Sequence, residues 1–430
     1  MNNWSIFDGS FPLKINKPIR LIELFAGIGA QAKALERLGA DFEHYRVCEF
    51  DKYAVTSYNA IHGTNFQKSD IREWTGADLG IVDKDKYAYI LTYSFPCQDL
   101  SICGAQKGME EGSGTRSALL WEVKRLLTEC DELPDVLLME NVPLVIGTAN
   151  RPHFFEWVQF LESLGYSNKW AILNSKDYNV PQNRERCFMA SFLGDFYYDF
   201  PDGVPLTRVL RDILQPDEEI DDRYFLSEKG VNCVMSRKGK YTQALDENSV
   251  IAQLALTAKG NANWTGNFIS SDPVLVGGYG EKKSNGGTQW FQQDRVYDAD
   301  AVAMAHCAGM SGGTYNYYVG NDLEVIDYYN KKRIDNNVVG VITTGCATNG
   351  SGTFLVKKPK SPIRKLTQRE CWRLMDFDDA DFDRAKKALN ETYYKGKDKS
   401  GTQMYKQAGN SIVVAVLEAI FKEMIGGKNG

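Results

Sequence analysis

The sequence predicts an α/β fold with a mostly parallel sheet, joined to a smaller region rich in strands and loops. Short apolar runs alternate with helical patterns through the first half of the 430-residue chain, which is typical of a parallel sheet with helices between its strands. A glycine-rich turn joins the first of these runs to the first helical pattern. After about residue 228 the texture changes, and 15 glycines lie between Gly260 and Gly352.

The strands of the first half are expected at its apolar runs, which are Arg20–Phe25, Tyr45–Cys48, Tyr87–Tyr93, Asp135–Met139 and Lys169–Leu173. The helices are expected where apolar residues recur with helical spacing, at Ala30–Leu38, from an N-cap at Asp51 to Tyr58, at Arg116–Leu127 and at Phe154–Leu164. Helical patterns return near the end of the chain, at Lys365–Met375, Asp381–Leu389 and Ile412–Ile425.

Composition narrows the chemistry that we expect. The nine cysteines include no Cys-x-x-Cys pair, and only four histidines are present, so we expect neither a disulfide framework nor a metal site. The N-terminus lacks a signal-peptide pattern, and no apolar run is long enough to cross a membrane. We therefore expect a cytoplasmic protein whose chemistry depends on cysteine and carboxylates.

The net charge of −6 argues against nucleic-acid binding, because phosphate contacts need lysine and arginine. The charges are unevenly distributed, however. Residues Lys229 to Lys365 include 16 Lys/Arg and 11 Asp/Glu, a net charge of +5, so the rest of the chain carries −11. A basic, glycine-rich segment of this kind is compatible with a polyanionic partner.

The first motif is the glycine-rich turn at Leu21–Ala30. Gly27 and Gly29 would let the backbone approach a ligand that no side chain could admit. Glu49 lies 20 residues after Gly29, where an acid that binds a ribose is expected. The pattern favours a nucleoside-type cofactor over a merely tight turn, but it does not separate NAD from S-adenosylmethionine.

The second motif, Tyr93–Gln98, directly follows a predicted strand. A Pro-Cys step at a strand end would expose the Cys97 thiol on a rigid loop, as a nucleophile requires. Taken alone, a buried structural cysteine is the commoner outcome. The next segment, Asp99–Gly114, contains four glycines, as a mobile lid would.

Two further motifs place polar side chains beside predicted strands. Glu140 directly follows the predicted strand Asp135–Met139, where a desolvated carboxylate can donate a proton; a helix cap is the alternative. Gln182, Arg184 and Arg186 alternate along an extended segment, so we expect their side chains to share one face. A solvated strand edge explains that pattern equally well.

Taken together, the motifs resemble the DNA cytosine C5-methyltransferase family, in both their order and their spacing. The resemblance covers residues 20–193 and 361–425, and residues 229–360 only in composition. The matching motifs are Phe25–Gly29, Phe95–Gln98, Glu140–Val142, Gln182–Arg186, Arg364–Phe377 and Tyr405–Ser411.

The resemblance implies a Rossmann-like domain that uses S-adenosylmethionine, with residues 1–228 as its main part, 229–360 as a target-recognition domain and 361–430 as a return segment completing the first domain. It assigns catalysis to Cys97, Glu140 and Arg184, and cofactor binding to Phe25, Gly27, Gly29, Glu49, Asp70, Leu120 and Asn410. It assigns substrate positioning to Pro96, Gln98, Asn141, Gln182 and Arg186.

The implied activity is methyl transfer to C5 of a flipped cytosine in double-stranded DNA, through a covalent bond from Cys97 to C6. We expect a monomer, without a membrane partner, and a cognate restriction endonuclease stays an open question. The rival readings are a tRNA cytosine C5-methyltransferase, whose branch usually carries a Cys-Phe-Thr tripeptide that is absent here, and an NAD-dependent oxidoreductase. The oxidoreductase reading would leave Cys97 and Glu140 unexplained.

Overall fold

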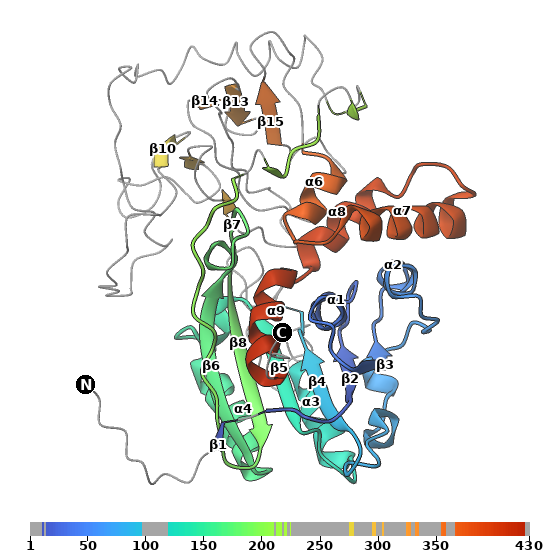
Figure 1. Cartoon of the computed structure of the whole chain (residues 1–430), viewed down its shortest axis with the longest axis vertical. Helices are drawn as coiled ribbons and strands as arrows, with labels where there is room; N and C mark the ends of the chain where they lie inside the picture. Colours follow the sequence, from blue (N-terminus) through green and yellow to red (C-terminus); the bar gives the residue numbers. More distant parts are fainter. Residues whose placement is uncertain are drawn as a thin grey trace.

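The computed structural model describes residues 11–12, 14–96, 119–209, 212–216, 219–221, 224 and 366–425, and the backbone of six short strands between Leu275 and Lys357 (Figure 1). The catalytic cysteine predicted at position 97, its neighbour Gln98 and the predicted lid Asp99–Gly114 lie outside the described residues. So does the start of the helix expected at Arg116–Leu127.

A six-stranded sheet forms the centre of the molecule, in the order β3-β2-β4-β5-β8-β6 (Figure 1). The first four strands run parallel, and β8 is antiparallel to both of its neighbours. The expected α/β fold with a mostly parallel sheet is therefore confirmed. The strands are β3 (Phe42–Cys48), β2 (Ile19–Leu24), β4 (Ala88–Tyr93), β5 (Val136–Asn141), β8 (Glu185–Leu193) and β6 (Tyr166–Asn174).

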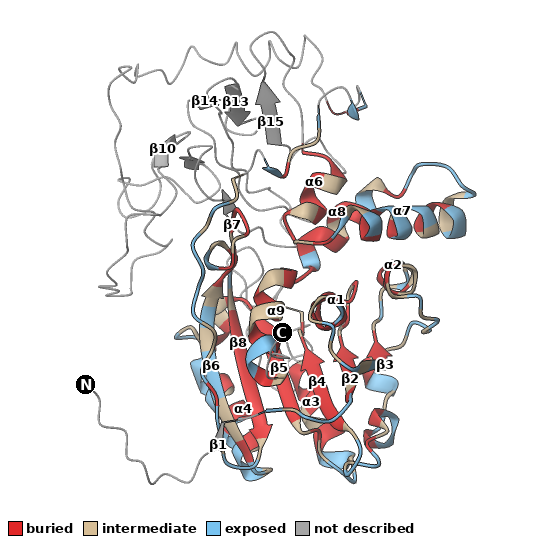
Figure 2. Cartoon of the chain, in the orientation of Figure 1, coloured by how far each residue is buried: buried red, intermediate tan, exposed pale blue. Residues whose placement is uncertain are grey.

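Helices cover both faces of the sheet, so its middle strands are buried (Figure 2). Alternate residues of β2 enter opposite cores: Leu21 packs with helices α1 (Ala30–Arg37) and α9 (Val414–Ile425), whereas Ile22 packs with α3 (Leu120–Glu129) and α4 (Arg151–Ser163). This alternation follows from the two-residue period of a strand. β4 and β5 are buried along their whole length, which explains why they read as continuous apolar runs.

Helix α2 (Lys52–His62) begins where the sequence predicted. Asp51 is its N-cap and accepts a hydrogen bond from the backbone N–H of Tyr53 at 2.9 Å, which satisfies one of the donors left unpaired at a helix start. The helix runs one turn beyond the expected end at Tyr58 and stops at Gly63, whose φ of 67° is left-handed. That conformation is the usual way for a helix to end at a glycine.

The C-terminal segment packs against the N-terminal one. It consists of α6 (Gln368–Arg373), α7 (Asp379–Tyr394), α8 (Gly401–Asn410) and α9. Ion pairs join the two segments, from Lys406 to Asp51 at 2.6 Å and from Arg37 to Asp376 at 2.7 Å. The sequence patterns anticipated α6, α7 and α9 but missed α8, in which three poor helix formers, Gly401, Gly409 and Asn410, weaken the helical pattern.

The short strands of the middle segment form small sheets. β10 (Leu275–Gly278) pairs with β11 (Arg295–Tyr297), and β13 (Glu324–Asp327) lies between β14 (Lys332–Ile334) and β15 (Phe354–Lys357). β12 (Ala303–Met304) pairs with β7 (Gln182–Asn183), and β1 (Phe11–Pro12) pairs with β9 (Phe196–Tyr197). Among the described helices, none is long and apolar enough to cross a membrane.

Candidate active site

A cavity of about 930 Å³ opens at the carboxyl ends of β2, β4 and β5. This is the edge at which parallel α/β sheets usually bind their ligands, and the volume suits a cofactor and a reacting group together. Of the predicted site residues, ten line the cavity: Phe25, Gly27, Glu49, Asp70, Pro96, Glu140, Asn141, Arg184, Arg186 and Asn410.

The turn after β2 forms one wall of the cavity. Gly27 has a φ of 58°, and a Cβ added there would meet no heavy atom within 4 Å, so the space beside its backbone is open to a ligand. Phe25 has a φ of 59° although it is not glycine, a strained conformation that such sites often contain. Its backbone N–H donates to the Cys48 carbonyl at 2.8 Å.

Glu49 joins this turn to the start of α2. One carboxylate oxygen accepts the backbone N–H of Gly27 at 2.9 Å, and the other accepts that of Asp51 at 2.7 Å. Burial raises the pKa of Glu49, and the two backbone hydrogen bonds oppose that rise. Because each carboxylate oxygen can accept a second hydrogen bond, Glu49 can also receive hydroxyl groups of a bound nucleoside.

Gly29 faces away from the cavity. A Cβ on Gly29, whose φ is 80°, would collide with the imidazole of His62 and come within 2.7 Å of the Tyr58 ring. The glycine is therefore needed for close packing of the turn against α2, rather than for the approach of a ligand that the sequence predicted. Only the first of the two glycines borders the cavity.

The other predicted cofactor residues differ in their positions. Asp70 lines the cavity, and hydrogen bonding from Arg72 lowers the pKa of its carboxyl group. Asn410, the last residue of α8, is exposed and also lines the cavity. Leu120 is fully buried in the core under the sheet, whereas its neighbour Leu119 borders the cavity. The predicted contact thus falls one residue away from the side chain that could make it.

Glu140, the last residue but one of β5, lines another wall of the cavity. Its carboxylate accepts a charged hydrogen bond from Nε of Arg186 at 3.0 Å. Burial raises the pKa of Glu140, while the positive charges of Arg186 and Arg184 oppose the rise. A buried carboxyl group with a raised pKa and access to a cavity can hold or donate a proton near neutral pH.

The segment with alternating polar residues joins the return segment to this wall. Arg184 donates from Nη2 to the carbonyl of Ser411 at 2.7 Å and to that of Gly409 at 3.2 Å. Gln182 does not line the cavity, and its amide donates to the Leu374 carbonyl at 3.0 Å. Two members of the motif, Gln182 and Arg184, therefore hold the C-terminal segment in place, and the third, Arg186, bonds to Glu140.

Asn141 fixes the backbone that leads to the predicted nucleophile. Its side-chain amide donates to the Phe95 carbonyl at 3.0 Å, and its side-chain oxygen accepts the backbone N–H of Val142 at 2.8 Å. The residue after Phe95, Pro96, lines the cavity. Position 97 follows Pro96 directly in the sequence. Asn141 therefore holds the backbone just before the predicted nucleophile.

Phe50 and Lys406 are cavity residues that the sequence patterns did not predict. Phe50 is 67% exposed, and the ammonium group of Lys68 lies 5.7 Å from the centre of its ring. An exposed aromatic ring beside a glycine turn offers a stacking surface for a planar ligand. Its position directly after Glu49 was an available signal, whereas Lys406 belongs to the helix that the patterns missed.

The model of the C-5 cytosine-specific DNA methylase family matches residues 19–426, nearly the whole chain. The chain belongs to this family. The motifs that carry the resemblance in the sequence thus reflect membership, and the fold identified above is that of a methyltransferase.

Individual relatives agree with the family assignment. This methylase is 28% identical over 454 residues to the type II methyltransferase M2.ScrFI of Lactococcus lactis subsp. cremoris, which covers 94% of this chain and 99% of the relative. It is 37% identical over 253 residues to the orphan methyltransferase M.SssI of Spiroplasma monobiae, covering 46% of this chain and 65% of the relative.

The fold also resembles that of solved methyltransferases. The crystal structure of the S. pombe Dnmt2 methyltransferase superposes with a TM-score of 0.53 at 17% sequence identity, covering 96% of this methylase and 99% of the other chain. At this identity the likeness concerns the fold alone. It extends the sequence-based family assignment to the three-dimensional arrangement of the sheet and its helices.

Proposed function

We propose that this methylase transfers a methyl group from S-adenosylmethionine to C5 of a cytosine flipped out of a specific double-stranded DNA sequence. The observation that carries the proposal is the single cavity, which joins the glycine turn and Glu49 on one wall to Pro96, Glu140 and Arg186 on the other. A methyl donor and a methyl acceptor must meet in one place, and this cavity provides it.

The residues of the first wall fit the proposed cofactor. The open space beside Gly27, the carboxylate of Glu49 and the exposed ring of Phe50 suit a backbone approach, a ribose and a planar base. Asp70 and Asn410 would complete the polar contacts. When bound there, S-adenosylmethionine supplies an activated methyl group. We keep Gly29 and Leu120 as residues that support the wall from behind.

The residues of the second wall would activate the base. In the first step of the proposed reaction, the Cys97 thiolate attacks C6 of cytosine and forms an S–C6 bond. The electron pair of the C5–C6 bond becomes available at C5, while Glu140 gives a proton to N3. Transfer of the methyl group to C5 breaks its bond to the donor sulfur, so that S-adenosylhomocysteine leaves. A base then removes the C5 proton, the S–C6 bond breaks and N3 returns its proton to Glu140, which restores the aromatic ring and the free Cys97 thiolate.

Two features support these roles. The raised pKa of Glu140 keeps a larger fraction of it protonated at neutral pH than an exposed carboxyl group would have, as an acid requires. Cys48 also lines the cavity, but burial raises the pKa of its thiol to about 12, so it stays protonated and is a poor nucleophile. Arg184 and Arg186, with Pro96, Gln98, Asn141 and Gln182, would position the base and the nucleophile's loop.

The nucleophile is tested by substitution and by trapping. We predict that Cys97→Ser abolishes methyl transfer but changes cofactor affinity by less than about threefold, because the glycine turn is untouched; Cys130→Ser, away from the cavity, is the control. Wild type should form a covalent adduct with duplex DNA that contains 5-fluorocytosine, since fluorine cannot leave as a proton. An adduct that maps to Cys103 or another cysteine would refute the assignment.

The substrate class is tested with the same purified protein. Duplex DNA should accept tritiated methyl groups, whereas tRNA should not, and NAD should not bind in competition with S-adenosylmethionine. Methylation of tRNA alone would establish the rival RNA-modifying function. We propose double-stranded DNA as the partner. A monomeric state and a cytoplasmic location stay predictions, and a cognate restriction endonuclease stays an open question.

We also propose that residues 229–360 determine which cytosine is methylated. The segment carries the positive charge balance of the chain and the glycine-rich stretches, whereas the proposed catalytic and cofactor residues lie outside it. We predict that replacing 229–360 with the matching segment of a related enzyme transfers the recognised sequence, as measured by bisulfite sequencing. An active chimera that keeps the original specificity would disprove the division.

A further inference from the structure

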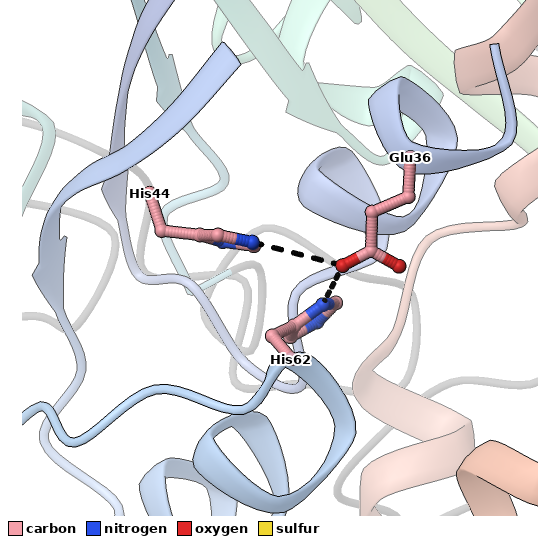
Figure 3. Close-up of side chains that lie close together, drawn as sticks. All are labelled: Glu36, His44 and His62. Atoms are coloured by element: carbon pink, nitrogen blue, oxygen red, sulfur yellow. Dashed lines mark hydrogen bonds and ion pairs between the residues drawn. The ribbon is translucent and has the colours of Figure 1, made fainter. Parts of the chain in front are cut away.

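A second cluster of polar residues lies behind the glycine turn, on the side away from the cavity. It consists of Glu36 on α1, His44 on β3 and His62 at the end of α2 (Figure 3). Oε1 of Glu36 lies 2.6 Å from Nδ1 of His62 and 3.6 Å from Nε2 of His44. The three potential ligand atoms lie within 4.8 Å of one another.

Each imidazole ring makes a second contact, through the nitrogen that does not face Glu36, and this contact orients the ring. Nε2 of His62 lies 3.2 Å from the carbonyl oxygen of Ile28, and Nδ1 of His44 lies 3.0 Å from the hydroxyl oxygen of Tyr58. Tyr58 in turn donates to the buried carboxylate of Glu23. If each ring donates its N–H to that outer oxygen, the remaining nitrogen of each ring presents a lone pair toward Glu36. Metal-binding histidines are held in this way.

We propose that Glu36, His44 and His62 bind a divalent transition-metal ion of the zinc class. Two imidazoles and a carboxylate form a ligand set that zinc accepts, with water as the fourth ligand. In a tetrahedral site with bonds of ~2.0–2.1 Å, ligand atoms are about 3.3 Å apart. The Glu36–His44 separation is close to this value, and the Glu36 carboxylate must move away from His62 by roughly 0.7 Å.

Glu36 has room to make that movement, because its side chain is 31% exposed, whereas the His62 side chain is fully buried. The nearest competing cation is Lys33, whose Nζ is 3.8 Å from Glu36. Lys33 is bound more closely by Asp378 and Asp381, each at 2.9 Å. The charge of Lys33 is therefore compensated by these two aspartates, and the Glu36 carboxylate can bind a metal ion.

A metal ion at this position would join three elements and brace the glycine turn. The ion would connect α1, β3 and α2 through one side chain each. His62 also contacts the turn directly, through the carbonyl of Ile28, and fills the space beside Gly29. Ile28 and Gly27 line the cavity on the other side of the same turn. The proposed ion would thus stabilise the wall that we assign to the cofactor.

The site is tested on the full-length protein after treatment with a chelator. Titration with Co²⁺ alone should give one bound ion with the visible absorption of a tetrahedral site and without thiolate-to-cobalt charge transfer, and Zn²⁺ should displace it. We expect Glu36→Gln and His44→Gln each to weaken Co²⁺ binding at least tenfold. His153→Gln is the control, because His153 on α4 pairs with Glu156 away from the cluster.

Thermal melting separates loss of the site from loss of the fold. Zn²⁺ should raise the Tm of wild type and of His153→Gln by a few degrees, through binding to the folded state, and should not raise that of Glu36→Gln. In chelator, Glu36→Gln should melt close to wild type, because its side chain is partly exposed. Absence of Co²⁺ binding by wild type, or equal binding by all variants, would overturn the proposal and leave the cluster as an ordinary histidine–carboxylate contact.

Discussion

Glu140 and Glu23 are two buried glutamates of the same sheet, and their surroundings differ. Glu140 is the last residue but one of β5, contacts Arg186 and borders the cavity. Glu23, in β2, is fully buried, does not border the cavity and accepts a hydrogen bond from Tyr58. Burial raises the pKa of both carboxyl groups, that of Glu23 to about 7.

The comparison teaches that a raised pKa alone does not identify a catalytic acid. Desolvation is the largest cause of the rise for both groups, because burial disfavours the charged form of any carboxyl group. What distinguishes Glu140 is access to the cavity and the two arginines that partly compensate its charge. These let its proton reach a substrate, whereas the proton on Glu23 can affect only the packing and charge of the interior.

The largest expected effect separates the two residues by activity. We predict that Glu140→Gln slows methyl transfer by about 10²–10⁴-fold, the usual contribution of acid catalysis, with DNA affinity changed far less. Glu23→Gln should keep the rate within about threefold at pH 6, where the native Glu23 is mostly uncharged. Single-turnover rates with tritiated methyl donor test both. Near-wild-type turnover by Glu140→Gln would remove that residue from the mechanism.

Much of the part of the site that borders the cavity could be predicted from the sequence, because its residues follow strand ends in a fixed order. Local patterns determine β2, the turn with Gly27, the N-cap at Asp51 and the position of Glu140 near the end of β5. The expected spacing of 20 residues after Gly29 also identified Glu49 as a cofactor-binding candidate. Position 97 lies outside the described residues, so its role stays a prediction.

The contacts on the side of the glycine turn away from the cavity could not be predicted, because they join elements that are distant in the sequence. The packing of Gly29 against His62 involves α2, and no spacing rule links Glu36, His44 and His62. The sequence therefore led to the expectation of no metal site, which the cluster now calls into question. The cofactor contact predicted at Leu120 falls at Leu119 in the structure. Only the geometry of the helix determines which of these two adjacent leucines points toward the cavity.

The next effect concerns stability and pH. Since the pKa of Glu23 rises from 4.5 to about 7 on folding, its contribution to stability is fully present below pH 4.5 and is lost as the pH rises through 7. The total loss is about 3 kcal/mol, at 1.36 kcal/mol for each pKa unit. Tyr58, His62 and Glu36 are the titratable groups that influence Glu23, and a chelator should be present so that no metal alters them.

We predict that Glu23→Gln removes most of this pH dependence, so that its free energy of unfolding exceeds that of wild type at pH 8 but not at pH 5. Urea unfolding at the two pH values measures the difference. Glu162→Gln, which removes an exposed carboxylate from α4, is the control and should follow wild type. A wild-type stability that does not fall between pH 5 and pH 8 would contradict the assigned shift.

The smallest expected effect compares the two glycines of the turn. Both have positive φ, at 58° for Gly27 and 80° for Gly29, so alanine is strained at either position by about 1 kcal/mol or more. Gly29→Ala also forces a Cβ against His62 and Tyr58, and overpacking of this kind costs about 1–3 kcal/mol. Gly29→Ala should therefore be less stable than Gly27→Ala by about 1–3 kcal/mol. Gly27→Ala, whose Cβ enters open space on the cavity side, should instead show the larger loss of S-adenosylmethionine affinity, measured by calorimetry on both folded variants. Equal losses of stability and of affinity would mean that the two sides of the turn are not separate in function.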